Sequence, residues 1–218
     1  MKLLALDTAT DACSVALYVD GTLLQRHEVA PQRHTQLLLP MVRALCAEAA
    51  LTLAGLDAIA LGIGPGAFTG VRVAASVAQG LAYAHALPVV EVSTLAALAQ
   101  GGFRLSGALD WLATLDARRQ ELYWAHYRIV DGLAVATGAE RVTPPTGVAL
   151  PAASGWRAAG TGWPAYAPAM GTAWPDPGAV APLLPEARDV AVLGAALLAA
   201  GGGIAPCDVA PTYLRDAL

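Results

Sequence analysis

The chain has 218 residues and a formal net charge of −4, and apolar residues make up 56% of it. This length is enough for one large domain or two small lobes. The most apolar stretch, residues 190–205, is interrupted by glycines and is shorter than the roughly 20 residues that a membrane-spanning helix needs. We therefore expect a soluble chain that makes no contact with a membrane.

The basic residues and cysteines narrow the chemistry further. Lys2 is the sole lysine among 13 basic residues, which excludes a G-x-x-x-x-G-K-[ST] phosphate loop and a Schiff-base lysine deep in a site. The acidic balance argues against a protein that binds nucleic acid by itself. Three cysteines without a C-x-x-C motif fit a reducing compartment, so we expect a cytoplasmic location.

Three short apolar runs, over residues 3–6, 13–19 and 22–29, predict an antiparallel meander at the start of the chain. Asp20-Gly21 between the last two is a strong hairpin signal. Helical spacing of apolar residues follows up to residue 49, and Pro40 indicates that this helix starts close by or kinks there.

A second set of elements surrounds a glycine-rich turn over residues 62–70. A buried strand is predicted before the turn over 56–63, and a helix after it over about 70–86 with Thr69 as its N-cap. The inner face of that helix carries small side chains, which allow another helix to approach closely. A strand over 87–92 and the start of a short helix over 94–99 complete this half, and Gly101-Gly102 is expected to interrupt the pattern after them.

The strand and helix pattern restarts near residue 108, which predicts two related lobes, residues 1–103 and 104–218. Paired strands are predicted over 111–115 and 121–129. Nine of the 15 prolines lie between residues 144 and 185, and all five tryptophans lie between 111 and 174, so we expect a looser, turn-rich lobe. A last helix over 189–200, with Asp189 as its cap, is expected to pack back towards the first lobe.

The glycine-rich turn matches a dinucleotide fingerprint on paper. Residues 62–67 fit G-x-G-x-x-[GA] after a strand, and Glu91 follows near the position of a ribose-binding acid. However, Pro65 interrupts the turn, and an antiparallel meander does not begin a doubly wound sheet. A tight turn whose glycines allow close packing is the preferred interpretation.

Asp7-Thr8, at the end of the first strand, is the second nucleotide candidate. Its position resembles the first phosphate loop of the actin, Hsp70 and sugar-kinase fold, but Ala9 stands where ATP-using members usually have glycine. Side chains that cap a turn are an equal alternative.

Other catalytic patterns are missing from the sequence. No two histidines are three or four residues apart, and no G-x-S-x-G motif occurs. Asp110, Asp116 and Glu121 cluster in the sequence, but their spacing does not assign acid and base roles. We therefore expect no catalytic residue, no metal and no cofactor. Residues 33–41 carry apolar side chains on more than one helical face, which indicates either a partner interface or burial of both faces inside the lobe.

Several segments together resemble one family over nearly the whole chain. They are LALDTATDACSVAL (4–17), RHTQLLLPMV (33–42), GPGAFTGVRV (64–73), LDARRQELYWAHY (115–127), GTGW (160–163) and PTYLR (211–215). The family is TsaB, also called YeaZ, of bacterial tRNA threonylcarbamoyladenosine biosynthesis proteins. The resemblance implies an actin-like (ASKHA) α/β fold of two related lobes, each a mixed sheet with an antiparallel meander flanked by helices.

The resemblance also implies partners. In that family TsaB is the non-catalytic paralogue of the transferase TsaD, and the ATPase TsaE joins the pair. Contact is made through two helices of the first lobe, the same surface can form a homodimer when TsaD is absent, and tRNA is reached only through the complex. The candidate contact residues in this chain, some of which must face the chain's own sheet, are His34, Leu38, Met41, Val42, Leu45, Thr69, Val71, Arg72, Ala74, Ala75 and Ala78.

Two rival functions stay open at this point. A nucleotide-using enzyme of the actin-like or dinucleotide-binding kind would depend on Asp7-Thr8 or on the glycine-rich turn. A module with its own RNA affinity would retain tRNA in a salt-sensitive way without any partner.

Overall fold

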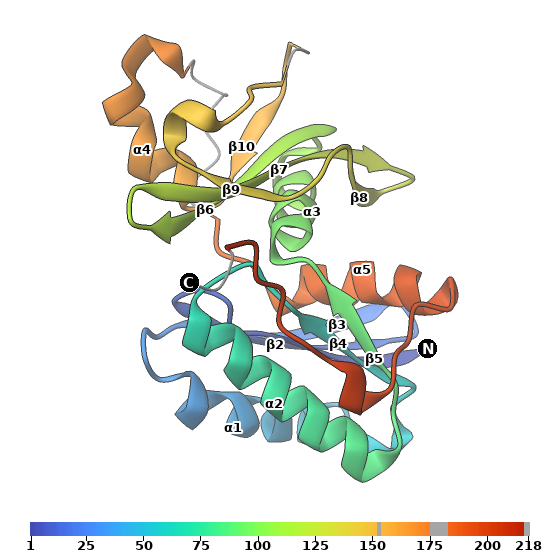
Figure 1. Ribbon diagram of the computed structural model, residues 1–218. Coiled ribbons are helices and arrows are strands. Elements are labelled where there is room, and N and C mark those ends of the chain that lie inside the picture. Colours follow the sequence, from blue (N-terminus) through green and yellow to red (C-terminus); the bar gives the residue numbers. More distant parts are fainter. Residues whose placement is uncertain (152–153, 175–182, 216–218) are drawn as a thin grey trace.

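The computed structural model describes residues 1–151, 154–174 and 183–215, and it shows two lobes that each contain a five-stranded mixed sheet (Figure 1). Part of the predicted proline-rich stretch, residues 175–182, lies outside the described residues. None of the described helices is long and apolar enough to cross a bilayer.

The first sheet has the strand order β3-β2-β1-β4-β5. The predicted meander is confirmed, because β1, β2 and β3 pair antiparallel and Asp20 and Gly21 turn the hairpin with positive φ. β4 and β5 add to β1 in parallel. The bounds are β1 Lys2–Asp7, β2 Ala12–Val19, β3 Thr22–Val29, α1 His34–Glu48, β4 Ala58–Gly62, α2 Phe68–His85 and β5 Val89–Val92.

The second sheet has the order β10-β6-β7-β8, with β9 also paired to β7. β6 and β7 form a long antiparallel hairpin, as the sequence predicts, and β10 pairs with β6 in parallel. The bounds are α3 Thr94–Ser106, β6 Asp110–Arg118, β7 Glu121–Val130, β8 Leu133–Ala136, β9 Arg141–Thr143, β10 Arg157–Ala159, α4 Gly162–Met170 and α5 Ala187–Ala199.

Helices cover both faces of the first sheet. Side chains alternate along a strand, so Leu4 and Leu6 point to the face covered by α1 and α2, while Ala5 points to α5. Figure 1 shows α1 and α2 on one side of this sheet and α5 on the other. α5 lies close to the sheet because the contact uses small residues: a Cβ added to Gly194 would stand 2.6 Å from the Cβ of Ala60.

Three predicted helix ends are wrong. α2 begins at Phe68 with Ala67 as its N-cap, so Thr69 lies inside the first turn. α3 continues through the expected break at Gly101-Gly102 to Ser106. Gly102 lies against the indole of Trp111, where a Cβ would be 2.5 Å away, so this glycine serves packing and does not end the helix. α5 begins at Ala187 and not at 189, and Glu186 is its N-cap. The lobe boundary expected after residue 103 falls inside α3.

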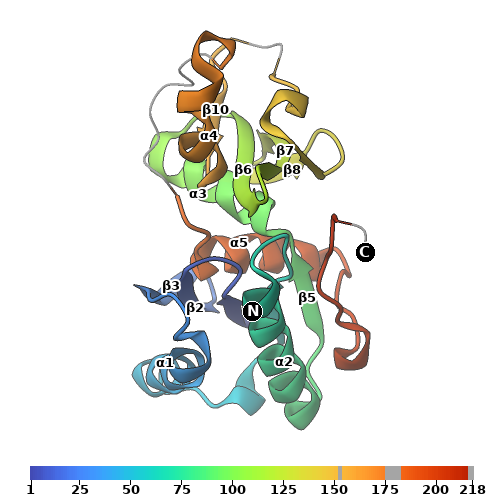
Figure 2. The same cartoon turned by 60° about the vertical axis from the view of Figure 1, so that its left-hand side comes forward.

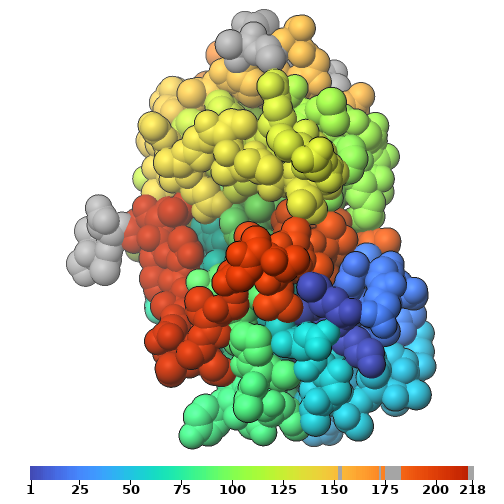
Figure 3. Space-filling model, turned by 90° about the vertical axis from the view of Figure 1, so that its right-hand side faces the viewer, coloured from blue at the N-terminus to red at the C-terminus, as the bar shows by residue number. Residues whose placement is uncertain are grey.

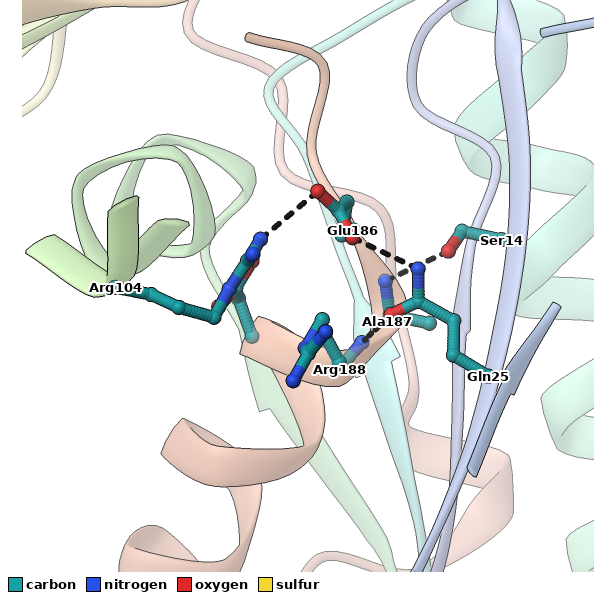
Figure 4. A network of polar contacts seen from close by, with 7 residues as sticks. Ser14, Gln25, Arg104, Glu186, Ala187 and Arg188 are labelled. Carbon is teal, nitrogen blue, oxygen red and sulfur yellow. Dashed lines mark hydrogen bonds and ion pairs between the residues drawn. The ribbon is translucent and has the colours of Figure 1, made fainter. Parts of the chain in front are cut away.

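A polar network joins α3 of the second lobe to the start of α5 (Figure 4). Arg104 donates from Nε to Asp189 Oδ1 and from Nη2 to Asp189 Oδ2, each at 2.9 Å, and from Nη2 to Glu186 Oε1 at 2.8 Å. Gln25 Nε2 donates to Glu186 Oε2 at 2.8 Å, and the Ala187 amide donates to Ser14 Oγ at 2.8 Å. Asp189, which the sequence predicted as a helix cap, is therefore part of an ion pair between α3 of the second lobe and α5.

Removal of the Arg104 guanidinium is expected to destabilise the protein. The side chain of Asp189 is 3% exposed, so Arg104→Met leaves a desolvated carboxylate without its partner. We expect a loss of about 2–3 kcal/mol in the free energy of unfolding by urea. Arg128→Met is the matched control, because the Arg128–Asp110 pair is more exposed to solvent, so its removal should destabilise the protein much less. Equal losses in the two variants would contradict this account.

Candidate functional site

The candidate phosphate loop at Asp7-Thr8 is closed by the chain itself. Both side chains have no solvent exposure. Thr8 Oγ1 donates to the carbonyl of Gly70 at 2.7 Å, and Asp7 Oδ1 accepts the amide of Ala9 at 3.0 Å. The Ala9 carbonyl in turn accepts the amide of Ala67 at 2.7 Å. These side chains cap and pack a turn, which is one of the two interpretations left open by the sequence.

The glycines of the β4–α2 turn make this closure possible. A Cβ at Gly62 would stand 2.0 Å from Asp7 Oδ2, and a Cβ at Gly70 would stand 2.0 Å from the Thr8 carbonyl oxygen. Contacts this short exclude any side chain at these positions. Glu91, the ribose candidate, accepts the amide of Ala210 at 3.3 Å instead. Room for the Asp7 side chain and for the Thr8 backbone therefore accounts for the glycines at 62 and 70.

Burial changes the acidity of the groups around this contact. Desolvation raises the pKa of Asp7 to about 7, although the hydrogen bond from Ala9 acts in the opposite direction. Burial, with the nearby charges of Asp7 and Glu28, raises the pKa of the Cys13 thiol to about 11. Asp7 Oδ2 is buried without a hydrogen-bond partner among the described residues.

The three clustered carboxylates of the second lobe each bind an arginine. Asp110 pairs with Arg128 at 2.8 Å, and Asp116 pairs with Arg118 at 3.3 Å. Glu121 pairs with Arg215, near the C-terminal end of the described chain. No group of three or more histidine, cysteine, aspartate or glutamate side chains in the described part of the chain is placed to hold a metal ion.

Burial sorts the candidate contact residues of α1 and α2 into two sets. The larger set lies in the chain's own core, at most 4% exposed: Leu38, Val42, Leu45, Val71, Ala74, Ala75 and Ala78. The remaining candidates are partly or fully accessible: His34, Met41, Thr69 and Arg72. His34 is held by a 2.8 Å hydrogen bond between Nε2 and the carbonyl of Thr10.

An exposed groove between α1 and α2 contains residues that the sequence analysis did not select. Its volume is about 400 Å³, and it is lined by Thr35, Leu38, Leu39, Phe68, Thr69, Arg72, Val73, Ser76 and Val77. Leu39 is 38% exposed and Phe68 is 67% exposed. Val73 and Val77 are four residues apart and form a second apolar stripe on α2, a signal that could have identified this face. We refer to these nine residues as the α1–α2 groove.

Figure 2 shows the two lobes one above the other. A cavity lies between them, and the β1–β2 loop contacts the start of α2. Two related lobes of this kind, each built on a mixed sheet, define an actin-like (ASKHA) α/β protein. This confirms the predicted fold class.

Comparisons with known proteins give the family. The family model for TsaD, the tRNA N6-adenosine threonylcarbamoyltransferase, matches residues 26–161. The TsaB protein of Escherichia coli (strain K12), a tRNA threonylcarbamoyladenosine biosynthesis protein, is 41% identical over 99% of this chain and 95% of its own length. The chain belongs to the TsaB (YeaZ) family.

Solved structures agree with this assignment. YeaZ from Pseudomonas aeruginosa is 47% identical and superposes with a TM-score of 0.93 over 98% of this chain and 99% of its own. A second structure, described as an uncharacterized protein with similarity to peptidase YEAZ from Pseudomonas aeruginosa, is 48% identical with the same TM-score and the same coverage.

The buried Asp7 makes stability depend on pH. Its folded pKa of about 7 lies above the ordinary value of 3.8, so the folded state loses stability as the pH rises between these values and stays level above them. Asp7→Asn keeps an oxygen for the Ala9 amide and carries no charge. We expect it to raise the free energy of unfolding by about 2–4 kcal/mol at pH 8, with a gain that shrinks toward pH 4.

Urea unfolding at pH 5 and pH 8 measures this difference. Asp131→Asn, on an exposed turn, is the control and should leave the pH profile of stability unchanged. A gain of equal size at both pH values would contradict the burial argument.

Proposed function

We propose that this chain is the non-catalytic partner subunit of TsaD in tRNA threonylcarbamoyl transfer and that it binds TsaD through the α1–α2 groove. The observation that carries the proposal is the exposed apolar lining of the groove, on the helices that the family resemblance assigns to partner binding. Phe68 is one of the most exposed large apolar side chains of the first lobe, and Leu39 is partly exposed beside it in the groove. Such a patch on a folded lobe is typical of a binding surface.

The closed β1–β2 loop supports a non-catalytic role. Asp7 and Thr8 are covered and hydrogen-bonded within the chain, so the rival proposal of a nucleotide-using enzyme lacks the loop on which it depended. No two histidines are three or four residues apart in the sequence. The proposed contribution of the chain is therefore to bind and orient TsaD.

The wider assembly follows from the same proposal. TsaE joins the TsaB–TsaD pair in the cytoplasm, and tRNA reaches this chain only as part of that complex. Two copies of the chain pair through the α1–α2 groove when TsaD is absent. The net charge of −4 supports the view that the isolated chain does not hold tRNA by itself.

A charge placed in the groove is expected to prevent assembly. Leu39→Asp puts a carboxylate where the proposed contact is apolar, while its exposed position allows the monomer to stay folded. We expect at least about 30-fold weaker binding to TsaD, the loss typical of a central contact residue. Leu105→Asp is the control, because Leu105 is 57% exposed on α3, outside the groove. Calorimetric titration with TsaD measures both variants, and unchanged binding by Leu39→Asp would exclude this surface.

Reconstitution tests the function itself. Threonylcarbamoyl transfer to tRNA is measured with TsaD and TsaE, with and without this chain, and also with this chain alone. We expect transfer only when TsaD and this chain are both present. Transfer by the chain alone would overturn the non-catalytic assignment, and full transfer without it would overturn the subunit role.

A further inference from the structure

A second and larger cavity lies between the two lobes. Its volume is about 840 Å³, within the range of sites that hold small molecules. The first lobe contributes the β1–β2 loop and the start of α2, including Phe68 and Arg72. The second lobe contributes the end of β6 and the turn to β7, including Arg118 and Arg119. We refer to this cavity as the interlobe cleft.

The C-terminal segment forms a further wall of the interlobe cleft. The Thr212 amide donates to the carbonyl of Ile63 at 3.0 Å, which fixes the segment to the first lobe. Arg215 then reaches the second lobe, where it donates to the Ala117 carbonyl at 3.3 Å and pairs with Glu121. Figure 3 shows this segment, in red, running along the first lobe up to the second.

Positive charge is concentrated in the interlobe cleft of an otherwise acidic chain. Four of the 12 arginines line it, but only two of the 17 acidic residues do so. Arg118 is paired with Asp116, and Arg215 with Glu121. Among the described residues, no carboxylate lies within ion-pair distance of the other two, Arg72 and Arg119.

Arg72 is part of an exposed aromatic surface. Its guanidinium lies 3.2 Å from the ring centre of Phe68 and 5.0 Å from that of Tyr213. The two rings are 6.1 Å apart, and Phe68 and Tyr213 are 67% and 50% exposed. Arg72 Nη1 donates to the Phe68 carbonyl at 3.3 Å, which leaves the other guanidinium N–H groups for a ligand. The wall therefore combines planar apolar surface with hydrogen-bond donors.

The turn that carries Arg119 holds an unusual backbone. Three consecutive residues, Arg118, Arg119 and Gln120, have φ values of 61°, 54° and 61°. Residues other than glycine, asparagine and aspartate rarely adopt this left-handed backbone conformation, and residues with strained backbones of this kind are enriched at binding and catalytic sites. The turn places Arg119 at the interlobe cleft, opposite the first lobe.

We propose that the interlobe cleft binds a small organic anion, with its carboxylate or phosphate between Arg72 and Arg119 and a planar apolar body against Phe68 and Tyr213. One lining carboxylate, Asp11, has no ion pair in the described residues, so the excess of positive charge in the cleft is small. A small excess suits a ligand with one or two negative charges better than a polyanion such as RNA. Bound in this way, the ligand contacts both lobes.

Phenyl phosphate tests the site, because it carries both the anion and the planar ring. We expect saturable binding to the full chain by calorimetry, weakened by salt, with inorganic phosphate and phenol each binding at least about tenfold more weakly. Arg119→Gln should weaken phenyl phosphate binding about tenfold or more, as expected for the loss of a charge-assisted hydrogen bond. Arg43→Gln, on the exposed side of α1, is the matched control and should bind like the wild type.

The outcomes separate this site from the proposed function. Arg119 lies outside the α1–α2 groove, so Arg119→Gln should bind TsaD normally while it loses phenyl phosphate. No binding of phenyl phosphate by the wild type would overturn the proposal, as would equal binding by the wild type and Arg119→Gln. Retention of tRNA by the isolated chain that Arg119→Gln weakens, without phenyl phosphate binding, would also overturn it in favour of a nucleic-acid site.

Discussion

The contact between the β1–β2 loop and the first turn of α2 determines much of this molecule. Gly66 and Gly70 let the backbone of this turn approach the backbone of Ala9 and Thr8 closely, and Gly62 leaves room for the side chain of Asp7. The contact fixes the direction of α2, and α2 with α1 forms the exposed groove. It also covers Asp7 and Thr8 and places Phe68 and Arg72 at the interlobe cleft. This contact thus closes the candidate phosphate loop, and it positions residues of both the α1–α2 groove and the interlobe cleft.

The two surfaces of α2 meet at its N-terminal end. Phe68 and Arg72 belong to the α1–α2 groove and also to the interlobe cleft. A protein bound in the groove would therefore touch the same side chains as a ligand in the cleft.

Local patterns in the sequence predict most of the fold. The Asp20-Gly21 hairpin, the strands of the first sheet, the β6–β7 hairpin and the helices around Pro40 and after the glycine-rich turn follow from residue spacing alone. β8, β9 and β10 were not predicted, because runs of four, three and three residues are too short to show a periodic pattern. Gly101-Gly102 misled the prediction because a glycine pair is typical of a helix end, whereas here Gly102 makes room for the ring of Trp111, which follows in the next strand. Asp189 misled it similarly, since its partner Arg104 is 85 residues away in the sequence.

The candidate site was harder to predict, because burial depends on tertiary packing. The heptad-like spacing of Leu38, Val42 and Leu45 is the same whether that face meets a sheet or a partner. The groove residue Phe68 lies at a helix start, where no periodic pattern identifies it. The interlobe cleft is lined by residues 11, 72, 119 and 215, which are far apart in the sequence. They come together only because the two lobes pack side by side and the C-terminal segment crosses from one lobe to the other.

The position of α5 has a consequence for the order of folding. The first sheet is made of residues before 93, yet the helix that covers its alanine face comes from residues 187–199. During synthesis that face, which includes Ala5, Ala16 and Ala60, stays uncovered while the whole second lobe emerges. The fold of the first lobe closes only when the last helix leaves the ribosome.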